Sequence, residues 1–394
     1  MKSIFGLRVI TGARRRQIIG LLLLAVVLGL SSCIEPYEPK VEGQTAGLLV
    51  VDGFINSDGV STIRLSRTAG LSQKVASQAE TRAKMFIELA NGPRYSLTET
   101  GTGTYTSGAL HLPAGVLVRL RFTTATGREY ASNQTTILLT PAIDSLTWRT
   151  RNDRLYVYAN THELGNQARY YRWSFGETWE FTSQFVSGLE YKNGRIVSRN
   201  ENIYRCWASE APTKIVLGNT LRLNQNIISE QIITQLPDTS VKLRTLYSTL
   251  VKQYALTAEE YTYWEALRKN TEIVGGLYDP LPTQLTGNVY CLTDDAEPVL
   301  GFVGAQSVQE KRLFISRSQL PPGWPYVTGY EKCVLYDIPT FPDPNPPTLE
   351  QIIDFFRQGP AIPVAPSLTG YYYSTAECVD CRKRGTNVKP SFWP

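Results

Sequence analysis

The sequence predicts a mainly β protein, built from tandem immunoglobulin- or fibronectin-like β-sandwiches with a helical insertion and a cysteine-rich, loop-rich C-terminal extension. Short segments of alternating apolar and polar residues recur between turns rich in Gly, Asn and Pro, which is the pattern of half-buried strands. Aromatic residues make up 11% and charged residues only 19% of the 394 residues, which argues against a disordered or coiled-coil chain. The length is sufficient for two or three domains.

Residues 1–32 predict a lipoprotein signal peptide. A basic stretch ends at Arg16, and the apolar run 18–30 would be about 20 Å long as a helix, too short for a bilayer core of about 30 Å. Leu30-Ser31-Ser32-Cys33 resembles a bacterial lipobox, in which the cysteine thiol is acylated and becomes the first mature residue. We expect Cys33 to anchor the protein in outer-membrane lipid, since several acyl chains anchor stably. An ordinary secretory signal and an uncleaved anchor are the alternatives.

Residues 33–46 predict an extended tether, because Pro36 and Pro39 stiffen the chain. Glu35 and Glu38 lie just behind Cys33, similar to the surface-export signal of Bacteroidota lipoproteins, and we expect the protein to face the cell exterior. The signal peptide holds five of the 40 basic residues and no acidic one, so 35 basic residues stand against 35 acidic ones in the rest of the chain. This balance gives no electrostatic basis for binding nucleic acid.

Residues 47–141 predict the N-terminal sandwich. Strand patterns at 48–55 and 62–66 flank the turn Asn56-Ser57-Asp58-Gly59. Further short strands are expected at 84–89, 95–99, 103–107 and 116–123. Strands this short, with no helical spacing between them, favour a sandwich.

Residues 142–318 predict a second sandwich. Strand patterns occur at 143–148, 154–160, 170–175 and 178–185, and they return at 299–308 and 312–316. Tyr171-Arg172-Trp173-Ser174-Phe175 is similar to strand C of such a sandwich, whose tryptophan fills the core. A helix is inserted near 257–274, where Thr257-Ala258-Glu259-Glu260 forms a capping box and Gly275-Gly276 ends the helix.

Residues 319–394 predict a C-terminal extension tied down by disulfides, with Pro-rich loops at 320–325 and 338–347 and a short helix from Thr348 to Gly359. Five cysteines follow Cys33, and an exported chain folds where disulfides form. Cys206, Cys333, Cys378 and Cys381 are the candidates for two bridges, and Cys291 is the candidate free thiol. The Cys378-Val379-Asp380-Cys381 spacing also allows a redox motif or, with Cys206 and Cys333, a zinc knot. The pairing is not determined by the sequence.

The sequence contains no Gly-x-Gly-x-x-Gly loop, Walker loop, Gly-x-Ser-x-Gly elbow or His-Glu-x-x-His motif. The two histidines, His111 and His162, are expected on the surface. Two acidic clusters, Asp294-Asp295 with Glu297 and Glu259-Glu260, are expected to be solvated at a turn and at a helix start. We therefore predict no enzyme, no catalytic residue, no metal and no cofactor. A carboxylate-based hydrolase is the least favoured alternative, because two carboxylates can suffice for glycoside hydrolysis.

Four aromatic residues are candidates for ligand binding, namely Tyr371, Tyr372, Tyr373 and Trp179. Alternating aromatics on strands are mostly core residues, but three consecutive tyrosines on one strand must face both sides. They would serve the main alternative function, a glycan- or matrix-binding adhesin.

A series of motifs makes the chain similar to a known family. In order, they are the lipobox Cys33, Leu-Val-Val-Asp-Gly-Phe-Ile (49–55), Tyr-Tyr-Arg-Trp (170–173), Cys206-Trp207, Tyr-Ser-Thr-Leu-Val-Lys-Gln-Tyr (247–254), Gly-Gly-Leu-Tyr-Asp-Pro (275–280), Gly287-Asn288, Val-Leu-Gly-Phe (299–302) and Cys378-Val379-Asp380-Cys381 through Gly385-Thr386-Asn387. The chain resembles the Bacteroidota outer-membrane lipoprotein family catalogued as domain of unknown function 4249.

The resemblance implies a non-enzymatic, surface-exposed lipoprotein that is an accessory or cargo-binding partner of a TonB-dependent receptor, with an unknown ligand. Cys291 is not part of the family motif, which supports its assignment as the free thiol. Asp144-Ser145-Leu146 resembles the O-glycosylation acceptor of this phylum, which makes Ser145 a candidate glycosylation site.

Overall fold

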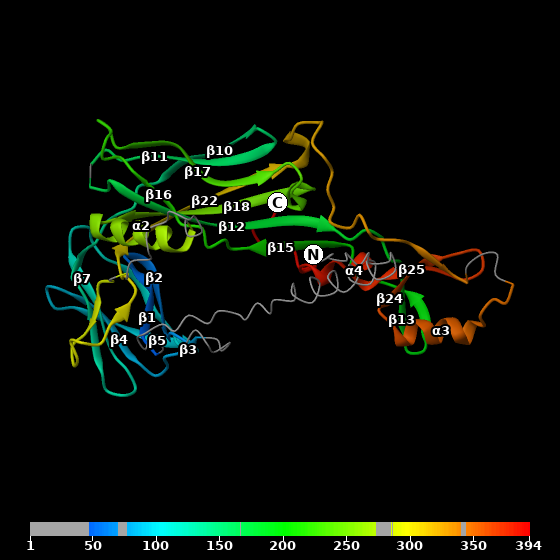
Figure 1. Ribbon diagram of the computed structural model, residues 1–394, viewed down its shortest axis with the longest axis horizontal. Coiled ribbons are helices and arrows are strands. Elements are labelled where there is room, and N and C mark those ends of the chain that lie inside the picture. The colour runs from blue at the N-terminus through cyan, green and yellow to red at the C-terminus, as the bar shows by residue number, and fades with distance from the viewer. Residues whose placement is uncertain (1–46, 70–76, 166, 273–284, 286, 340–343) are drawn as a thin grey trace, which may run out of the picture. The chain divides into compact units, whose positions relative to one another are not determined.

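The computed structural model describes residues 47–69, 77–165, 167–272, 285, 287–339 and 344–394 (Figure 1). The predicted signal peptide, Cys33, the tether and the Gly275-Gly276 helix stop lie outside the described residues. The chain is mainly β, as predicted. None of the helices in the described ranges has the length and apolar character needed to span a membrane.

The first domain is a single hydrogen-bonded sheet, whose main path runs β19-β8-β7-β4-β5-β6-β2-β1-β20. Its strands are β1 (Leu49–Asn56), β2 (Asp58–Arg67), β3 (Gln78–Ala79), β4 (Lys84–Leu89), β5 (Arg94–Gly101), β6 (Thr104–His111), β7 (Leu117–Thr123), β8 (Glu129–Ser132), β9 (Thr135–Thr136), β19 (Val289–Cys291), β20 (Val299–Leu300) and β21 (Ala305–Gln306). Adjacent strands are antiparallel, except that β20 and β21 run parallel to β1.

The two ends of this sheet meet, so the domain is barrel-like and not a pair of separate sheets. The Asn288 side chain, next to β19, donates to the carbonyl of Val303 at 3.0 Å and accepts from its N–H at 2.8 Å. The sheet encloses one apolar core, which includes Leu49, Ile87 and Phe122. Closure leaves the outer face of β1 and β2 available to pack against other elements.

Residues 287–307 differ from the prediction, because they were assigned to the second sandwich and instead complete the first domain. β19 pairs with β8, and β20 and β21 pair with β1. Val299, Val303 and Ala305 are buried in the first core. The alternating pattern identified strands here but carries no information about which sheet edge they join.

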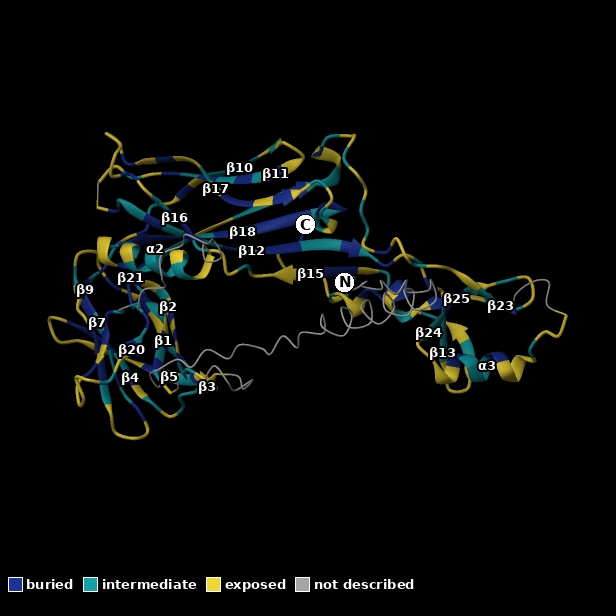
Figure 2. Cartoon of the chain, viewed as in Figure 1, coloured by how far each residue is buried: buried dark blue, intermediate teal, exposed yellow. Residues whose placement is uncertain are grey.

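The second domain is a two-sheet sandwich. One sheet contains β10 (Ile143–Arg151), β11 (Arg154–His162) and β17 (Ile227–Pro237); the other contains β12 (Tyr170–Thr182), β15 (Arg205–Glu210), β16 (Val216–Asn219), β18 (Leu246–Leu256) and β22 (Val308–Ser316). Buried positions run along β12 and β18 (Figure 2). Trp173 is 0% exposed and packs with Tyr171 and Val251 between the sheets, which confirms the predicted core tryptophan. Its indole N–H donates to Gln253 Oε1 at 2.8 Å.

The inserted helix is α2 (Ala258–Glu272), close to the predicted range. The Thr257 hydroxyl accepts the N–H of Glu260 at 3.2 Å, so one half of the predicted capping box forms. The Glu260 carboxylate does not complete the box. It accepts instead from Trp264 and Gln306, and this places it in the protein interior.

The C-terminal extension contains α3 (Leu349–Gln358), α4 (Ala376–Val379) and a small sheet of β23 (Tyr336–Ile338), β25 (Tyr371–Thr375) and β24 (Ala361–Pro366). The hairpin β13 (Leu189–Lys192) and β14 (Arg195–Ser198) packs against it. One-turn 3-10 helices lie at Val241–Leu243, Arg317–Gln319 and Cys381–Lys383. The helix α3 begins after Thr348, as predicted, and Thr348 caps it in a complete capping box.

Two disulfides join Cys206 to Cys381 and Cys333 to Cys378, and Cys291 is free and buried. The bridged residues are the four that the sequence named as disulfide candidates. The first bridge fixes the tail on β15, where Trp207 and Thr386 exchange backbone hydrogen bonds of 2.8 and 2.9 Å. The extension is therefore tied to the second sandwich.

Candidate ligand-binding cavity

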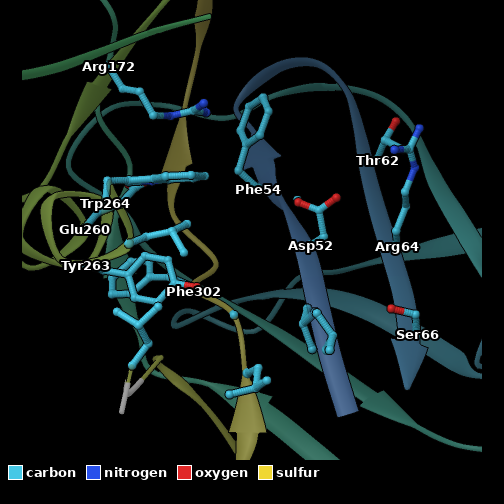
Figure 3. A pocket seen from close by; sticks show the side chains of 17 residues that line it. Asp52, Phe54, Thr62, Arg64, Ser66, Arg172, Glu260, Tyr263, Trp264 and Phe302 are labelled. Atoms are coloured by element: carbon cyan, nitrogen blue, oxygen red, sulfur yellow. The ribbon is translucent and has the colours of Figure 1, made fainter. Parts of the chain in front are cut away.

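A cavity of about 690 Å³ lies between the outer face of β1 and β2, the helix α2 and the segment after β20 (Figure 3). Arg172, from β12 of the second sandwich, also lines it. The site exists because residues 287–307 return to the first domain and bring Leu300, Gly301 and Phe302 opposite α2. Its volume lies within the range of small-molecule pockets, about 300–1,000 Å³.

Arg172 is the cation of this cavity. Alternation along β12 turns Tyr171 and Trp173 into the core and Arg172 to the opposite face. Its guanidinium carbon lies 4.2 Å from the ring centre of Tyr254 and 4.3 Å from that of Trp264. At these distances an aromatic ring attracts a cation. Burial lowers the pKa of Arg172, against the opposing effects of Tyr254, Glu260 and Asp52. The group remains a cation, since arginine does not deprotonate in proteins.

The buried Nε of Arg172 has no hydrogen-bond acceptor among the described residues. Within the same residues, no carboxylate lies within ion-pair distance of the guanidinium, which Figure 3 shows directed toward Phe54. A buried N–H without a partner costs about 1–3 kcal/mol, more for a charged group, so this donor is a position where an acceptor would be stabilising.

Glu260 is the buried carboxyl of the cavity and is 2% exposed. Trp264 Nε1 donates to it at 3.3 Å and Gln306 Nε2 at 3.5 Å. The carboxyl packs against Gly304, where an added Cβ would meet Oε2 at 2.1 Å. Burial raises the pKa of Glu260 to about 7, although the charge of Arg172 and these two hydrogen bonds oppose the shift.

Aromatic residues form the remaining wall. Tyr263 and Phe302 have ring centres 5.4 Å apart, and Phe54 lies across from them. Burial, followed by the charge of Asp52, raises the pKa of Tyr263. Asp52 and Arg64 are cross-strand partners at the exposed rim. The cavity therefore combines planar apolar surfaces with one guanidinium and one carboxyl in its floor.

The sequence did not single out Arg172 or Trp264 as site residues, and it named Glu260 only within an acidic cluster that was expected to be solvated. The signal for Arg172 was a long cation at the centre of an aromatic strand motif, Tyr-Tyr-Arg-Trp. Glu260 was predicted to be a solvated helix-capping acid, and this was wrong because α2 lies over Gly304 and Gln306. Nothing local in the sequence shows which surface a helix covers.

The candidate binding aromatics lie elsewhere. Tyr371 and Tyr373 pack against α3, with ring centres 6.2 and 6.0 Å from Phe356, whereas Tyr372 faces away and is 37% exposed. The three tyrosines thus face both sides of β25, as the strand geometry required. Trp179 is half-buried, with the Lys242 ammonium 5.0 Å from its ring centre.

The other candidate residues named from the sequence include Ser145, the two histidines and an acidic pair. Ser145 is half-buried in β10 and accepts from Asn160 Nδ2 at 3.1 Å. His111 and His162 are exposed and lie 2.7 and 2.8 Å from Asp58 and Asp144. Asp294 and Asp295 are exposed, as expected.

Glu297 differs from the prediction of a solvated acid, because its side chain is only 10% exposed. It accepts from Arg128 Nη1 at 2.5 Å and from the Tyr130 hydroxyl at 3.0 Å. Burial raises the pKa of Glu297, but these hydrogen bonds outweigh it and hold the pKa below its usual value. Glu297 fastens the 287–307 segment to β8.

Solved structures give only distant similarities. A two-domain fibronectin type III segment of chicken tenascin shares 11% identity over 52% of this chain and 88% of its own, with a TM-score of 0.14. A protein from Bacteroides uniformis described as carbohydrate-binding shares 10% over 53% and 90%, with a TM-score of 0.14. The Yersinia pseudotuberculosis adhesin InvE shares 14% over 54% and 58%, with a TM-score of 0.15. Scores this low carry no argument about function.

A search of the curated proteins found no match. The family model described as domain of unknown function, DUF4249, matches residues 34–312. This range covers well over half of the chain and includes the whole cavity, from β1 through Arg172 and α2 to Phe302. The chain therefore belongs to the DUF4249 family, as its motifs predicted.

Proposed function

We propose that this protein is a non-enzymatic outer-membrane lipoprotein, anchored through an acylated Cys33 and facing the cell exterior, that binds cargo for or assists a TonB-dependent receptor. The observation that carries the proposal is the combination of a lipobox cysteine with a ligand-sized cavity on the β scaffold that follows it. Aromatic walls and a stacked guanidinium are features of sites that hold a ligand.

One observation favours a second candidate, a carboxylate-based hydrolase. Asp52 and Glu260 both line the cavity, and burial raises the pKa of Glu260 to about 7 while Asp52 is exposed. Two carboxyls in contrasting surroundings are the arrangement that glycosidases use. Binding is the stronger proposal because Glu260 is 2% exposed and lies against Gly304, so a substrate has little access to it.

The adhesin alternative receives less support from the aromatic residues on which it was based. Tyr371 and Tyr373 pack against α3, and Trp179 is half-buried beside Lys242. Tyr372 is the member of the set with an outward-facing ring.

The test of the proposed function is made on native membranes. Mass spectrometry of the purified chain is expected to show a triacylated Cys33 at its N-terminus, and protease treatment of intact cells is expected to degrade the protein. Affinity purification is expected to recover a TonB-dependent receptor. The Cys33→Ala variant is the matched control and should lose all three properties. An intact leader or an unacylated N-terminus would overturn the proposed anchoring. Affinity purification that recovers no TonB-dependent receptor would overturn the proposed partnership.

Hydrolase activity is tested on the same preparation. If the second candidate were correct, aryl glycosides would be hydrolysed and Glu260→Gln and Asp52→Asn would each abolish the activity. We expect no turnover in any of the three proteins.

A further inference from the structure

We propose that the cavity beneath α2 binds a carboxylate carried on an aromatic or similarly planar apolar body, with Arg172 holding the carboxylate. This inference rests on the proposed binding function and names the class of ligand for the same site.

The guanidinium of Arg172 lies at the cavity beside two aromatic rings. The ring centres of Tyr254 and Trp264 lie 4.2 and 4.3 Å from its guanidinium carbon, and the N–H donors of a guanidinium lie in its plane. The buried Nε has no acceptor among the described residues. A planar fork of donors matches a carboxylate, which accepts two parallel N–H bonds in the same plane.

The walls select the rest of the ligand. Phe54, Tyr263 and Phe302 present rings, and Leu267 adds an aliphatic surface. Rings favour offset or edge-to-face contact with another ring, which contributes beyond the burial of apolar area. A cavity of about 690 Å³ accommodates a ligand of one or two rings.

The charges of the cavity argue for a singly charged acid. Asp52 lies at the rim and Glu260 in the floor, so two carboxyl groups face the same space as Arg172. A phosphate, with a charge near −2 at neutral pH, would meet more repulsion from them than a carboxylate. A neutral sugar would leave the guanidinium of Arg172 without a carboxylate at ion-pair distance.

Because Glu260 lies near Arg172, the affinity for the ligand is expected to depend on pH. An arginine with a purely structural role would not give this dependence. The groups facing it are Arg172 from β12, Gln306 from β21 and Trp264 from its own helix, with Asp52 on β1 across the cavity. When Glu260 is protonated, the charge of Arg172 is available to a ligand. When Glu260 ionises above about pH 7, it competes for that charge, so affinity is expected to fall between about pH 6 and about pH 8.

Calorimetry on the full chain, purified in detergent, tests the inference with matched acids and amides. The small-molecule probes are 3-phenylpropionate and its uncharged amide; the peptide probes are Ala-Ala-Phe with a free C-terminus and with a C-terminal amide. Each acid is expected to bind about 10- to 100-fold more tightly than its amide, because hydrogen bonds to a charged group are lost in the amide. Binding of the first acid alone identifies small acids as the source, and binding of the second alone identifies peptide C-termini.

Three variants locate the binding. Arg172→Gln is expected to abolish the difference between acid and amide. Leu267→Trp fills the cavity without altering Arg172 and is expected to abolish binding of the acids and of the amides. This variant also tests the inference if Arg172→Gln does not fold. Arg154→Gln removes an exposed arginine of β11 outside the cavity and should leave the affinities unchanged.

Equal affinity for acid and amide, unchanged binding by Leu267→Trp, or no binding of either acid at about 10 mM would overturn the inference. These results are independent of the membrane experiments. An acylated chain that co-purifies with its receptor and ignores both acids would contradict this inference alone, whereas a chain that binds them but carries an unacylated N-terminus would contradict the proposed anchoring alone.

Discussion

Two glutamates of this protein are each 2% exposed, yet their surroundings differ. Glu177, on β12, lies 2.5 Å from the Lys242 ammonium and accepts from the Tyr247 hydroxyl at 2.5 Å. Glu260, on α2, has only neutral donors at 3.3 and 3.5 Å. One buried carboxylate is paired directly with a cation, and the other lies in the floor of the cavity with neutral hydrogen-bond donors.

The pKa values of the groups at the two positions reflect this difference. Burial lowers the pKa of Lys242, but the hydrogen bonds that its ammonium donates to Glu177 and Glu210 outweigh this effect and hold the pKa above its usual value. Burial and the charge of Glu177 raise the pKa of Tyr247 well above 10.0. At Glu260 burial prevails. A paired buried charge joins parts of a fold, whereas a buried carboxyl without an ion pair beside a cavity is a candidate functional group.

The largest effect is expected for Lys242→Met. It leaves Glu177 buried without its cation, which costs about 3–5 kcal/mol of unfolding free energy. Denaturant unfolding at neutral pH measures this. Lys252→Met is the matched control, because its pair with Glu310 is about half exposed, at 41% and 44%, and is expected to contribute less than about 1 kcal/mol. Equal losses in the two variants would remove the contrast on which the comparison depends.

A smaller effect of opposite sign is expected for Glu260→Gln. The pKa of Glu260 is about 7 in the folded protein against 4.5, so the folded state holds the proton at higher pH and stability falls as the pH rises between these values. Glutamine removes this loss and should stabilise the protein by up to about 3 kcal/mol at pH 8, with little change at pH 4.

Thermal unfolding across this pH range checks the Glu260 prediction. Glu259→Gln, on the same helical turn but exposed, is the control and should not change the stability at pH 4 or at pH 8. Destabilisation of Glu260→Gln at pH 8 would show that the carboxylate is paired after all.

The smallest effect is expected for Glu297→Gln, and its pH dependence is the reverse. The pKa of Glu297 is below its usual value, so its contribution is present above the unfolded pKa and is lost as the pH falls through the folded one. We expect a loss of about 1–2 kcal/mol at pH 7 that disappears in acid. If the loss persisted in acid, packing and not charge would explain the role of Glu297.

Local patterns in the sequence predicted several elements well. The alternation in Tyr171-Arg172-Trp173 placed Trp173 in the core, and a capping signal located the start of α2. These signals succeed because each depends on neighbours within a few residues.

The features that build the site depend on distant parts of the chain. Alternation along β12 places Arg172 on the face opposite Trp173, but only the fold shows that the rings of Tyr254 and Trp264 lie beside its guanidinium. The return of residues 287–307 to the first sheet was missed because a strand pattern does not name its partner. Glu260 is buried for the same reason, since Gly304 and Gln306 come from that returning segment.

By itself, the sequence determined the β class, the core tryptophan, the helix starts, the family and the expectation of an acylated Cys33, because these follow from residue types and short spacings. The tertiary structure decided which cysteines pair, which sheet receives residues 287–307, and that Arg172 and Glu260 share one cavity. Those outcomes depend on contacts between residues that are far apart in the chain, and short-range patterns carry no record of such contacts.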